Sequence, residues 1–468
     1  MMFGNSYGPS RSIRTTVNWW IVACYVVLVL IGWMNIYAAA HTEETTSIFD
    51  WSCRSGKQFV WILTSFMLGV VILFIIPPRV YEPVTPFVYA VILLMLIAVI
   101  FVGSDIKGSH SWFKLGPVSI QPAELSKIAT SLMLACVMSR GGFHLKGRSL
   151  WITIAIIAVP MLIIVAEKET GSALVYVGFV FMLYREGLSG WIIAIIGLAI
   201  LLFILTIVHS TFLGILVLAG VISLMDCALD GKLKWWLAIG APLVTGCCFV
   251  LEKYRLIVVV SLTAAYAAFS LWRAIRGIRQ SFRLATLTVL LGGMLLAFSA
   301  DFLFNNVLKD YQRERVEALL GMAEDSYNVR QSKIAIGSGG MWGKGFLEGT
   351  QTASRFVPEQ STDFIFCTVG EEWGFFGCIC VIGLYVLLIY QIIKDSERSR
   401  EAFTRIYGYC LAGCLFMHLF INIGMTLGLM PVIGIPLPFL SYGGSSIWTF
   451  TIMLFIFVAL DRNERKYF

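Results

Sequence analysis

Apolar runs long enough to cross a lipid bilayer recur along the chain and limit what it can fold into. Residues 17–39, 59–77, 87–103, 150–166 and 447–460 are nearly free of charge. About 20 apolar residues in a helix span a hydrocarbon core roughly 30 Å thick. Inside that core the backbone polar groups must pair within the segment, so each run is predicted to be a helix. The sequence therefore predicts an all-α polytopic membrane protein.

Composition supports this class. Hydrophobic residues make up 58% of the chain and charged residues 13%, whereas soluble domains are about half apolar and about a quarter charged. The first run follows Arg11 and Arg14 but is too long for the apolar part of an export signal, so we expect it to remain as a helix. Most of the 11 cysteines fall in apolar runs without metal-site spacing, which predicts neither a disulfide framework nor a metal centre.

The charges between the runs predict a topology. With the N-terminus inside, Lys and Arg concentrate in alternate loops, as the positive-inside rule requires of cytoplasmic segments. Both termini are therefore predicted to be cytoplasmic. We expect about ten core helices and about four extra ones, at residues 17–39, 58–77, 84–103, 122–139, 150–166, 171–184, 189–208, 211–229, 233–250, 255–272, 284–304, 364–393, 404–427 and 445–460.

This topology divides the chain into three parts. Residues 1–186 hold core helices 1–6, residues 187–282 form an inserted block of about four helices, and residues 283–468 complete the core. The external loop 305–362 in the last part is too long for a simple connector, which argues for function. The loops 103–121 and 429–445 are predicted to lie on the same external face.

One charged motif lies where an external loop becomes a helix. Pro122 suits a first helical turn, and Glu124 and Lys127 then share one face of that helix. Charges at membrane depth usually mark a lined cavity. The alternative is an interfacial anchor, with Trp112 in the aromatic belt and Lys127 reaching toward the headgroups.

A second motif is rich in glycine. Five glycines fall within residues 337–345, and Arg330, Lys333 and Lys344 place cations nearby. Glycine lets a backbone approach a ligand closely, so the segment resembles a phosphate cradle in composition. The P-loop spacing is absent, and a flexible turn is the alternative.

Asp363 is the third candidate. It is predicted to lie at the external mouth of a helix, with Ser361 or Thr362 as the N-cap. One interpretation is a partner for the helix dipole; the other is a general base that takes a proton from a sugar hydroxyl. Glu371 and Glu372 lie about two turns deeper and should face a cavity or a partner helix.

The segment 422–446 is dense in proline and glycine. Such a sequence breaks the helix into a re-entrant loop, which a membrane protein tolerates only where protein or a water-filled cavity lines it. These features predict a polar external cavity, and on physical grounds that cavity suits a transporter as well as an enzyme.

Together the four stretches resemble the RodA/FtsW/SpoVE family, the SEDS proteins. The similar motifs are Gln121-Pro-x-Glu-Leu-x-Lys127, residues 331–340, Thr362-Asp-Phe-Ile-Phe366 and residues 422–446. The resemblance covers about residues 10–186 and 283–465. Gly343-Lys-Gly345 and Gly349-Thr-Gln351 look more like the cell-elongation RodA branch than the division branch.

This resemblance implies a glycosyltransferase that polymerises lipid II into glycan strands at the external face of the bacterial inner membrane during elongation and shape maintenance. Undecaprenyl diphosphate would be the leaving group, and Asp363 the base for the acceptor 4-hydroxyl. Lys127, with Arg330 and Lys333, would neutralise the diphosphate. The implied substrate-binding residues are Trp112, Glu124, Lys127, Arg330, Lys333 and Lys344.

The resemblance also implies partners. One is a class B penicillin-binding protein, which cross-links the strands, and the others are membrane lipids. No nucleic acid is expected to bind. A divalent cation, Mg²⁺ or Mn²⁺, could share the neutralisation of charge, although the sequence shows no ligand cluster. The open alternatives are a flippase or transporter for the lipid-linked precursor, and a scaffold that only anchors the penicillin-binding protein.

The chain departs from the family pattern in two places. Where the family usually has Gln-Pro-Asp-Leu-Gly-Thr/Ser-Ala, this sequence has Glu167-Lys-Glu-Thr-Gly-Ser-Ala173. The acidic position survives as Glu169, but the proline is lost. The second departure is the block 187–282, where the family pattern has a short cytoplasmic link; an even number of helices there returns the chain to the same side.

Overall fold

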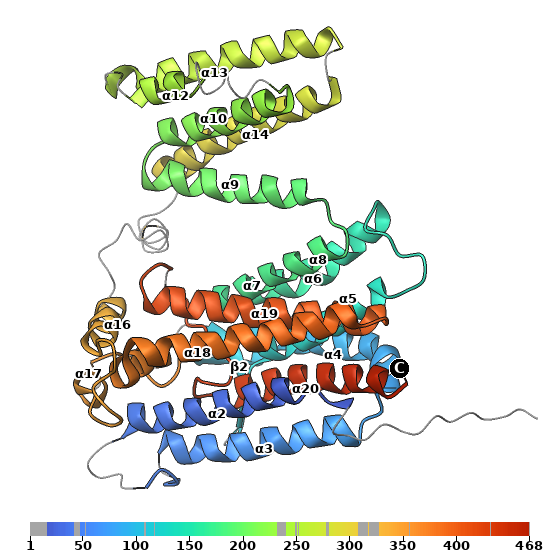
Figure 1. Cartoon of the computed structure of the whole chain (residues 1–468), viewed down its shortest axis with the longest axis vertical. Coiled ribbons are helices and arrows are strands. Elements are labelled where there is room, and N and C mark those ends of the chain that lie inside the picture. Colours follow the sequence, from blue (N-terminus) through green and yellow to red (C-terminus); the bar gives the residue numbers. More distant parts are fainter. Residues whose placement is uncertain are drawn as a thin grey trace, which may run out of the picture. The chain divides into compact units, whose positions relative to one another are not determined.

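The computed structural model contains two compact units. The core unit comprises Met1–Leu188 with Asp325–Phe468, and the second unit is Ser189–Glu324 (Figure 1). The residues that the structure describes are 16–41, 47–51, 53–106, 109–116, 118–231, 240–248, 250, 252–277, 280–307, 317, 327–354, 356–430 and 432–467.

Helices dominate both units. The core unit contains α2 (Trp19–Ala40), α3 (Arg54–Phe74), η1 (Pro78–Val80), α4 (Tyr81–Val102), α5 (Pro122–Met138), α6 (Arg148–Ala166), α7 (Thr170–Val175), η2 (Tyr176–Gly178), α8 (Phe179–Arg185), α16 (Tyr327–Ser338), α17 (Thr350–Ala353), α18 (Ile365–Arg398), α19 (Ala402–Thr426) and α20 (Gly444–Tyr467). The second unit contains α9 (Gly190–Val208), α10 (Thr211–Leu229), α12 (Ala241–Cys248), α13 (Glu252–Ile275), α14 (Gln280–Phe302) and η4 (Leu303–Val307).

Among the described residues, 11 helices are long and apolar enough to cross a membrane. The prediction of a polytopic helical membrane protein is confirmed. Three predicted segments are not among the 11. Helix α5 has only 17 residues, the segment 171–184 is divided among α7, η2 and α8, and much of 233–250 lies outside the described residues.

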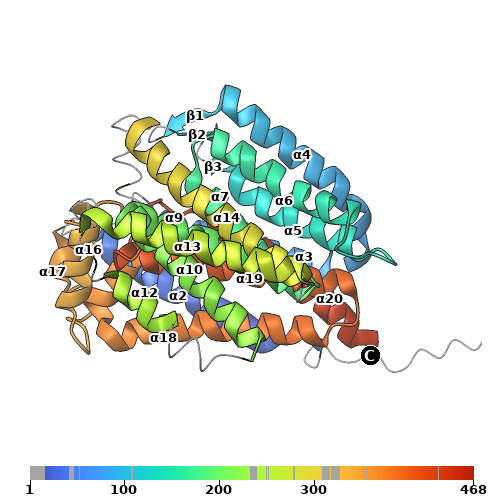
Figure 2. The ribbon, with the colours of Figure 1, turned by 90° about the horizontal axis from the view of Figure 1, so that it is seen from above.

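Helices α19 and α20 form the centre of the core unit. In each, 83% of the most apolar window is buried within the protein, although these two helices are among the least apolar of the 11. Helix α19 packs against α5 and α18, and α20 packs against α3. Figure 2 shows α4, α5 and α6 side by side on one flank of this centre.

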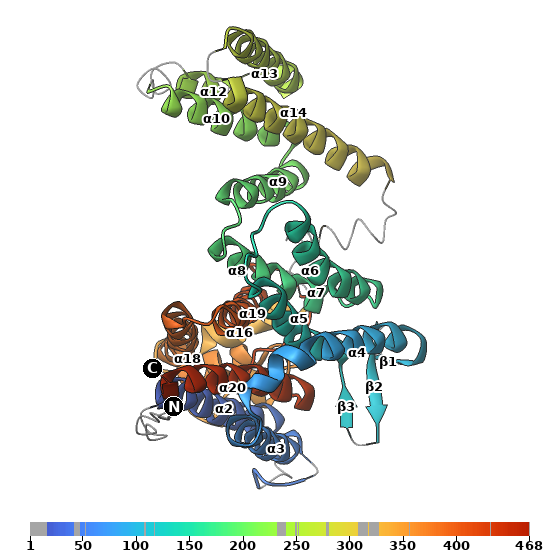
Figure 3. The ribbon, with the colours of Figure 1, turned by 90° about the vertical axis from the view of Figure 1, so that its right-hand side faces the viewer.

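A small sheet follows α4, where the sequence analysis expected only an external loop. Strands β1 (Ser104–Ile106), β2 (Ser109–Leu115) and β3 (Val118–Ile120) are antiparallel in the order β1-β2-β3 (Figure 3). Leu115 pairs with Val118, so a two-residue connection joins β2 to β3. It begins with Gly116 at φ 64, which glycine adopts without strain. Strands β1 and β3 have three residues each, too few to show alternation in the sequence.

The second unit differs from the predicted block 187–282. Helix α14, which we expected in the C-terminal part of the core, packs with α9, α10 and α13. Gly293 lies so close to Leu218 of α10 that a Cβ there would approach its Cδ2 to 2.7 Å. Arg283 of α14 also pairs with Asp226 at 3.1 Å and Asp230 at 2.8 Å. These contacts explain why the unit extends beyond residue 282.

Candidate active site

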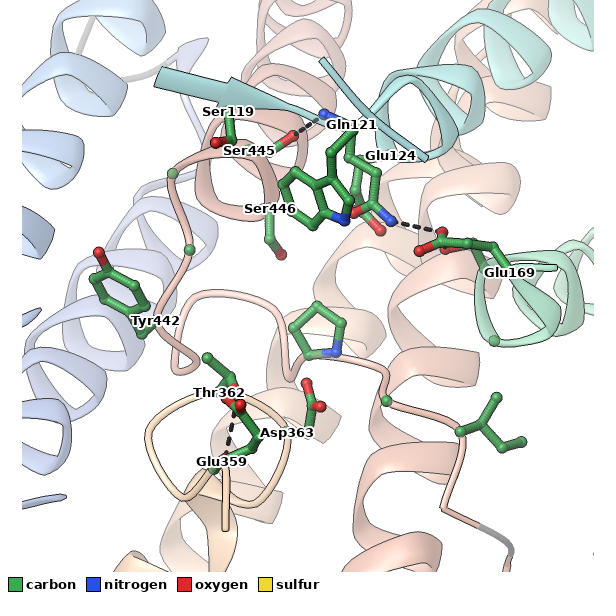
Figure 4. A pocket seen from close by; sticks show the side chains of 18 of the residues that line it. Ser119, Gln121, Glu124, Glu169, Glu359, Thr362, Asp363, Tyr442, Ser445 and Ser446 are labelled. Atoms are coloured by element: carbon green, nitrogen blue, oxygen red, sulfur yellow. Dashed lines mark hydrogen bonds between the residues drawn. The ribbon is translucent and has the colours of Figure 1, made fainter. Parts of the chain in front are cut away.

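A cavity of about 490 Å³ lies in the core unit. Its walls come from the start of α5, the turn before α7, the segment before α18 and the segment between α19 and α20 (Figure 4). Four carboxylates line it: Glu124, Glu169, Glu359 and Asp363. The other lining residues are Trp61, Trp112, Ser119, Gln121, Lys168, Thr170, Gly171, Ser172, Thr362, Ile433, Gly434, Pro436, Tyr442, Gly443, Gly444, Ser445, Ser446 and Trp448.

The described part of the segment between α19 and α20 is irregular and largely buried. Asn422 of α19 donates hydrogen bonds to the carbonyl oxygens of Ile435, at 2.7 Å, and Asp363, at 2.8 Å. Ser441 Oγ donates to Thr362 O at 2.6 Å. These bonds satisfy backbone groups that no helix pairs, as burial requires, and they tie this segment to the chain around Asp363.

Asp363 itself is half-buried on the cavity wall. A turn precedes it, in which Glu359 O accepts hydrogen bonds from the backbone N of Thr362 at 3.1 Å and of Phe364 at 3.3 Å. Opposite lies Gly434 at φ 73, where a Cβ would lie 3.4 Å from Asp363 Oδ2. The predicted N-cap is wrong. Helix α18 begins at Ile365, so Phe364 occupies that position without a side-chain bond, and Thr362 Oγ1 donates to Glu359 O in the preceding turn.

Glu124 and Lys127 form a buried pair at the same cavity. Lys127 Nζ donates to Glu124 Oε1 at 2.6 Å and lies 2.9 Å from His418 Nε2. His418 Nδ1 lies 2.9 Å from Pro436 O. Because that carbonyl can only accept, Nδ1 carries the proton and Nε2 accepts from Lys127. His418 could not be predicted from the sequence as a partner of Lys127, since 291 positions separate the two residues.

The two members of this pair face different surroundings. Glu124 lines the cavity, and its Oε2 is buried with no hydrogen-bond partner among the described residues. Lys127 is fully buried and is not one of the described lining residues. Glu124 therefore meets the cavity with one oxygen bonded to Lys127 and the other buried without a partner among the described residues, and Lys127 holds Glu124 in position.

Glu169 anchors a second polar network on the wall. Its carboxylate accepts from Gln121 Nε2 at 2.5 Å, Ser111 Oγ at 3.0 Å and Ser172 Oγ at 3.1 Å. Burial raises the pKa of Glu169, and these hydrogen bonds oppose that rise. In the sequence, the only sign of this residue was that it keeps the acidic position of the motif at residues 167–173. Trp112, next to Ser111, is half-buried and lines the cavity.

Three predicted cationic residues do not line the described cavity. Arg330 and Lys333 are exposed on α16. Lys344 Nζ instead donates to Glu371 Oε1 at 2.8 Å and to Thr350 Oγ1 at 2.7 Å. The structure thus brings Asp363, Glu124 and Trp112 together at the cavity, with Lys127 behind them. The three cationic residues lie elsewhere in the core unit.

The glycine-rich segment packs against α18 and does not form a phosphate cradle. A Cβ on Gly339 would lie 2.0 Å from Gly370 O, and one on Gly343 would lie 2.1 Å from Glu372 O. The backbone N–H groups of Lys344 and Gly345 donate to Glu371 O and Glu372 O at 3.0 and 3.1 Å. Helix α18 is kinked at Gly374, with φ 65. The donors that would face a phosphate are therefore occupied by helix carbonyls.

Sequence comparison shows that the chain belongs to the FtsW/RodA/SpoVE family. The family model, described as "Cell cycle protein", matches residues 18–234 and 244–466. The peptidoglycan glycosyltransferase MrdB of Escherichia coli K12 is 31% identical over 388 residues, covering 81% of this chain and 79% of MrdB. The peptidoglycan glycosyltransferase RodA of Treponema pallidum is 30% identical over 453 residues, covering 94% and 96%.

Solved structures share the fold. A chain from a peptidoglycan synthase complex superposes with a TM-score of 0.62 at 21% identity, covering 96% of this chain and 98% of its own length. The protein is thus a multi-pass membrane protein of this family. The family match omits only residues 235–243 between its ends, so it runs through most of the segment 187–282 that we predicted to be an insertion.

Proposed function

We propose that this protein is a peptidoglycan glycosyltransferase that polymerises lipid II into glycan strands during cell elongation. Its relatives MrdB and RodA carry that enzyme name. The observation that carries the proposal is the position of Asp363. Its carboxylate lies on the wall of a polar cavity with Glu124 and Trp112, and its backbone is held by Asn422.

The reaction assigns a task to each of these side chains. The 4-hydroxyl oxygen of the acceptor sugar attacks C1 of the donor sugar, and the bond from C1 to the diphosphate oxygen breaks. Undecaprenyl diphosphate leaves with the electron pair, while Asp363 takes the hydroxyl proton as general base. Trp112 offers an aromatic face to a sugar ring, and Glu124 Oε2 can accept a hydrogen bond from a sugar hydroxyl.

A divalent cation, Mg²⁺ or Mn²⁺, is part of this proposal. The described residues contain no group of three or more His, Cys, Asp or Glu side chains that could hold a metal ion. A cage made only of protein ligands is therefore not available in that part of the chain. Mg²⁺ is commonly held by one or two carboxylates together with substrate phosphates, and Asp363 or Glu124 could supply such a carboxylate. The ion would neutralise charge on the diphosphate.

The proposed setting is the bacterial inner membrane, with the cavity on the external face and a class B penicillin-binding protein as partner. The positive-inside distribution of charge supports the orientation. The solved complex to which this chain is similar coordinates polymerization and crosslinking. That similarity motivates including the cross-linking enzyme in assays of this protein.

The test is a polymerisation assay with purified protein, its partner, labelled lipid II and divalent cation, followed by gel separation of the products. Wild type should give a ladder of glycan strands. Asp363→Ala and Asp363→Asn should reduce it by about 10²- to 10⁴-fold, the usual effect of losing a general base. Glu348→Gln, which changes an exposed carboxylate away from the cavity, is the matched control. Adding EDTA, which removes divalent ions, tests whether polymerisation requires the cation.

Each other outcome has a definite meaning. A ladder that persists in both Asp363 variants removes this residue as the base but leaves the enzyme. No ladder under any condition, together with transfer of lipid II across the membrane of reconstituted vesicles, would support a flippase and overturn the proposal.

A further inference from the structure

The cavity contains one cation that the predicted diphosphate-binding residues did not include. Lys168 is the only Lys or Arg among the described lining residues, and it shares the cavity with four carboxylates. Its side chain is exposed, and its ammonium group has no hydrogen bond or ion pair among the described residues. A diphosphate entering beside those carboxylates would be repelled unless a cation lies nearby.

The other candidate cations have different partners. Lys127 is buried against Glu124 and His418, and Lys344 is paired with Glu371. Arg54 lies beside Tyr442, with its guanidinium carbon 5.8 Å from the ring centroid. It donates to Ser361 Oγ at 2.6 Å and does not line the described cavity. Lys168 is thus the cation best placed to meet an anion there.

The backbone at Lys168 is unusual for a lysine. Helix α6 ends in a Schellman pattern, in which Lys168 N donates to Val165 O at 3.0 Å and Glu169 N donates to Ile164 O at 3.2 Å. Lys168 occupies the left-handed position of this pattern, with φ 64. Glycine is the usual residue there because a Cβ strains this conformation. Strained residues are retained mainly at functional sites.

The neighbouring residue fixes the turn in place. Glu169 directly follows Lys168 and is held by Gln121, Ser111 and Ser172. Gly171, two residues further on, packs against the segment between α19 and α20, where a Cβ would approach Ile433 O to 3.0 Å. The position of Lys168 at the cavity is therefore set from both sides, by α6 before it and by this anchored network after it.

We propose that the ammonium group of Lys168 binds the diphosphate of the lipid-linked substrate. This inference rests on the proposed function and names the group that would hold the leaving side of the reaction. As the bond from sugar C1 to the diphosphate oxygen breaks, the electron pair goes to the lipid diphosphate. Lys168 stabilises the charge that develops there and remains protonated throughout.

The test uses Lys168→Gly and Lys168→Asn, because both residues accept the left-handed backbone. Relief of strain predicts that Lys168→Gly unfolds at the same or a higher temperature than wild type. Loss of a hydrogen bond to a charged group predicts that KM for lipid II and the inhibition constant of undecaprenyl diphosphate both rise by about 10- to 100-fold. Lys168→Arg should stay much closer to wild type than either neutral variant.

The matched control is Lys114→Met, which removes an exposed lysine of β2 that does not line the described cavity. It should leave KM and product inhibition unchanged. Direct binding of labelled undecaprenyl diphosphate to detergent-solubilised full-length protein separates this inference from the proposed function, because it needs no turnover. Weaker binding to Lys168→Gly than to wild type supports the inference even if no strands form. Wild-type binding and KM in both neutral variants would overturn it while leaving the glycosyltransferase intact.

Discussion

The core unit contains two lysine–glutamate pairs of similar length, each with a buried carboxylate, in different surroundings. Lys127 and Glu124 are 2.6 Å apart, and Lys344 and Glu371 are 2.8 Å apart. Glu124 and Glu371 are both buried, at 2% and 0% exposure. Both lysines are predicted from the sequence to bind substrate. Only the first pair adjoins the described cavity.

The difference lies in how completely each carboxylate is hydrogen-bonded. Besides Lys344, Glu371 accepts from the backbone N of Gln351 and of Thr352, both at 2.8 Å, and from Thr352 Oγ1 at 2.6 Å. Glu124 has one oxygen bonded to Lys127 and one with no partner among the described residues. A saturated buried carboxylate stabilises the fold, whereas one with a free oxygen at a cavity can bind a ligand.

The largest expected effect comes from removing the saturated carboxylate. Glu371→Ala leaves two backbone N–H groups and the hydroxyl of Thr352 without their acceptor in a buried site. Each buried polar group left without a partner costs about 1–3 kcal/mol. We expect a large fall in the thermal unfolding temperature and in the yield of folded protein, measured by fluorescence-detected chromatography after heating. An unchanged unfolding temperature would show that this network is not structural.

The next effect concerns activity at the other pair. Glu124→Gln keeps the size of the side chain and an oxygen that can accept from Lys127, but it removes the charge that pairs with this fully buried lysine. Because that loss also lowers stability, activity is compared per folded molecule. We expect polymerisation to fall by about 10²-fold, equivalent to about 2.7 kcal/mol of transition-state stabilisation. The protein that remains folded should still bind its partner. Full activity per folded molecule would contradict the assignment of the free oxygen to the ligand.

A third carboxyl extends the comparison to a group with no hydrogen bond. Glu167 is buried, and neither carboxyl oxygen has a partner among the described residues. Burial, with a contribution from Glu169, raises the pKa of Glu167 to about 8. A raised pKa in the folded state means that the unfolded state loses the proton first. Stability is therefore greatest below the unfolded pKa of about 4.3 and is lost as the pH rises toward 8.

This dependence predicts a stabilising substitution. Glu167→Gln cannot ionise, so it should raise the unfolding temperature by several degrees at pH 8 and change it little at pH 5. Differential scanning fluorimetry at both pH values measures this. Equal shifts at the two pH values would mean that ionisation of Glu167 does not limit stability.

The smallest effect concerns the lysine that sequence analysis placed at the substrate. Lys344→Met removes one of several donors to Glu371, so we expect a loss of about 1–2 kcal/mol in the free energy of unfolding. Because Lys344 does not line the described cavity, KM for lipid II should stay at the wild-type value. A raised KM with unchanged stability would restore Lys344 to the binding site and remove the distinction between the two pairs.

Several features of the site could be predicted from local sequence. Asp363, Glu124 and Trp112 lie in motifs whose composition is unusual for membrane helices, and all three line the cavity. Their chemistry was visible because charge at membrane depth is costly and stands out against an apolar background. The glycine-rich segment also stood out. Its composition predicts that something approaches its backbone closely, but it could not show whether this is a ligand or the backbone of another helix.

The sequence by itself determined the membrane-spanning class, because the length and hydropathy of each apolar run are local properties that match the bilayer thickness. Only the tertiary structure decided that α14 packs in the second unit, that His418 supports Lys127, and that Lys168 lines the cavity. Hydrogen-bond partners such as Lys127 and His418 come from segments far apart in the chain. Their pairing depends on how the helices pack, and the residues that flank each of them in the sequence do not predict that packing.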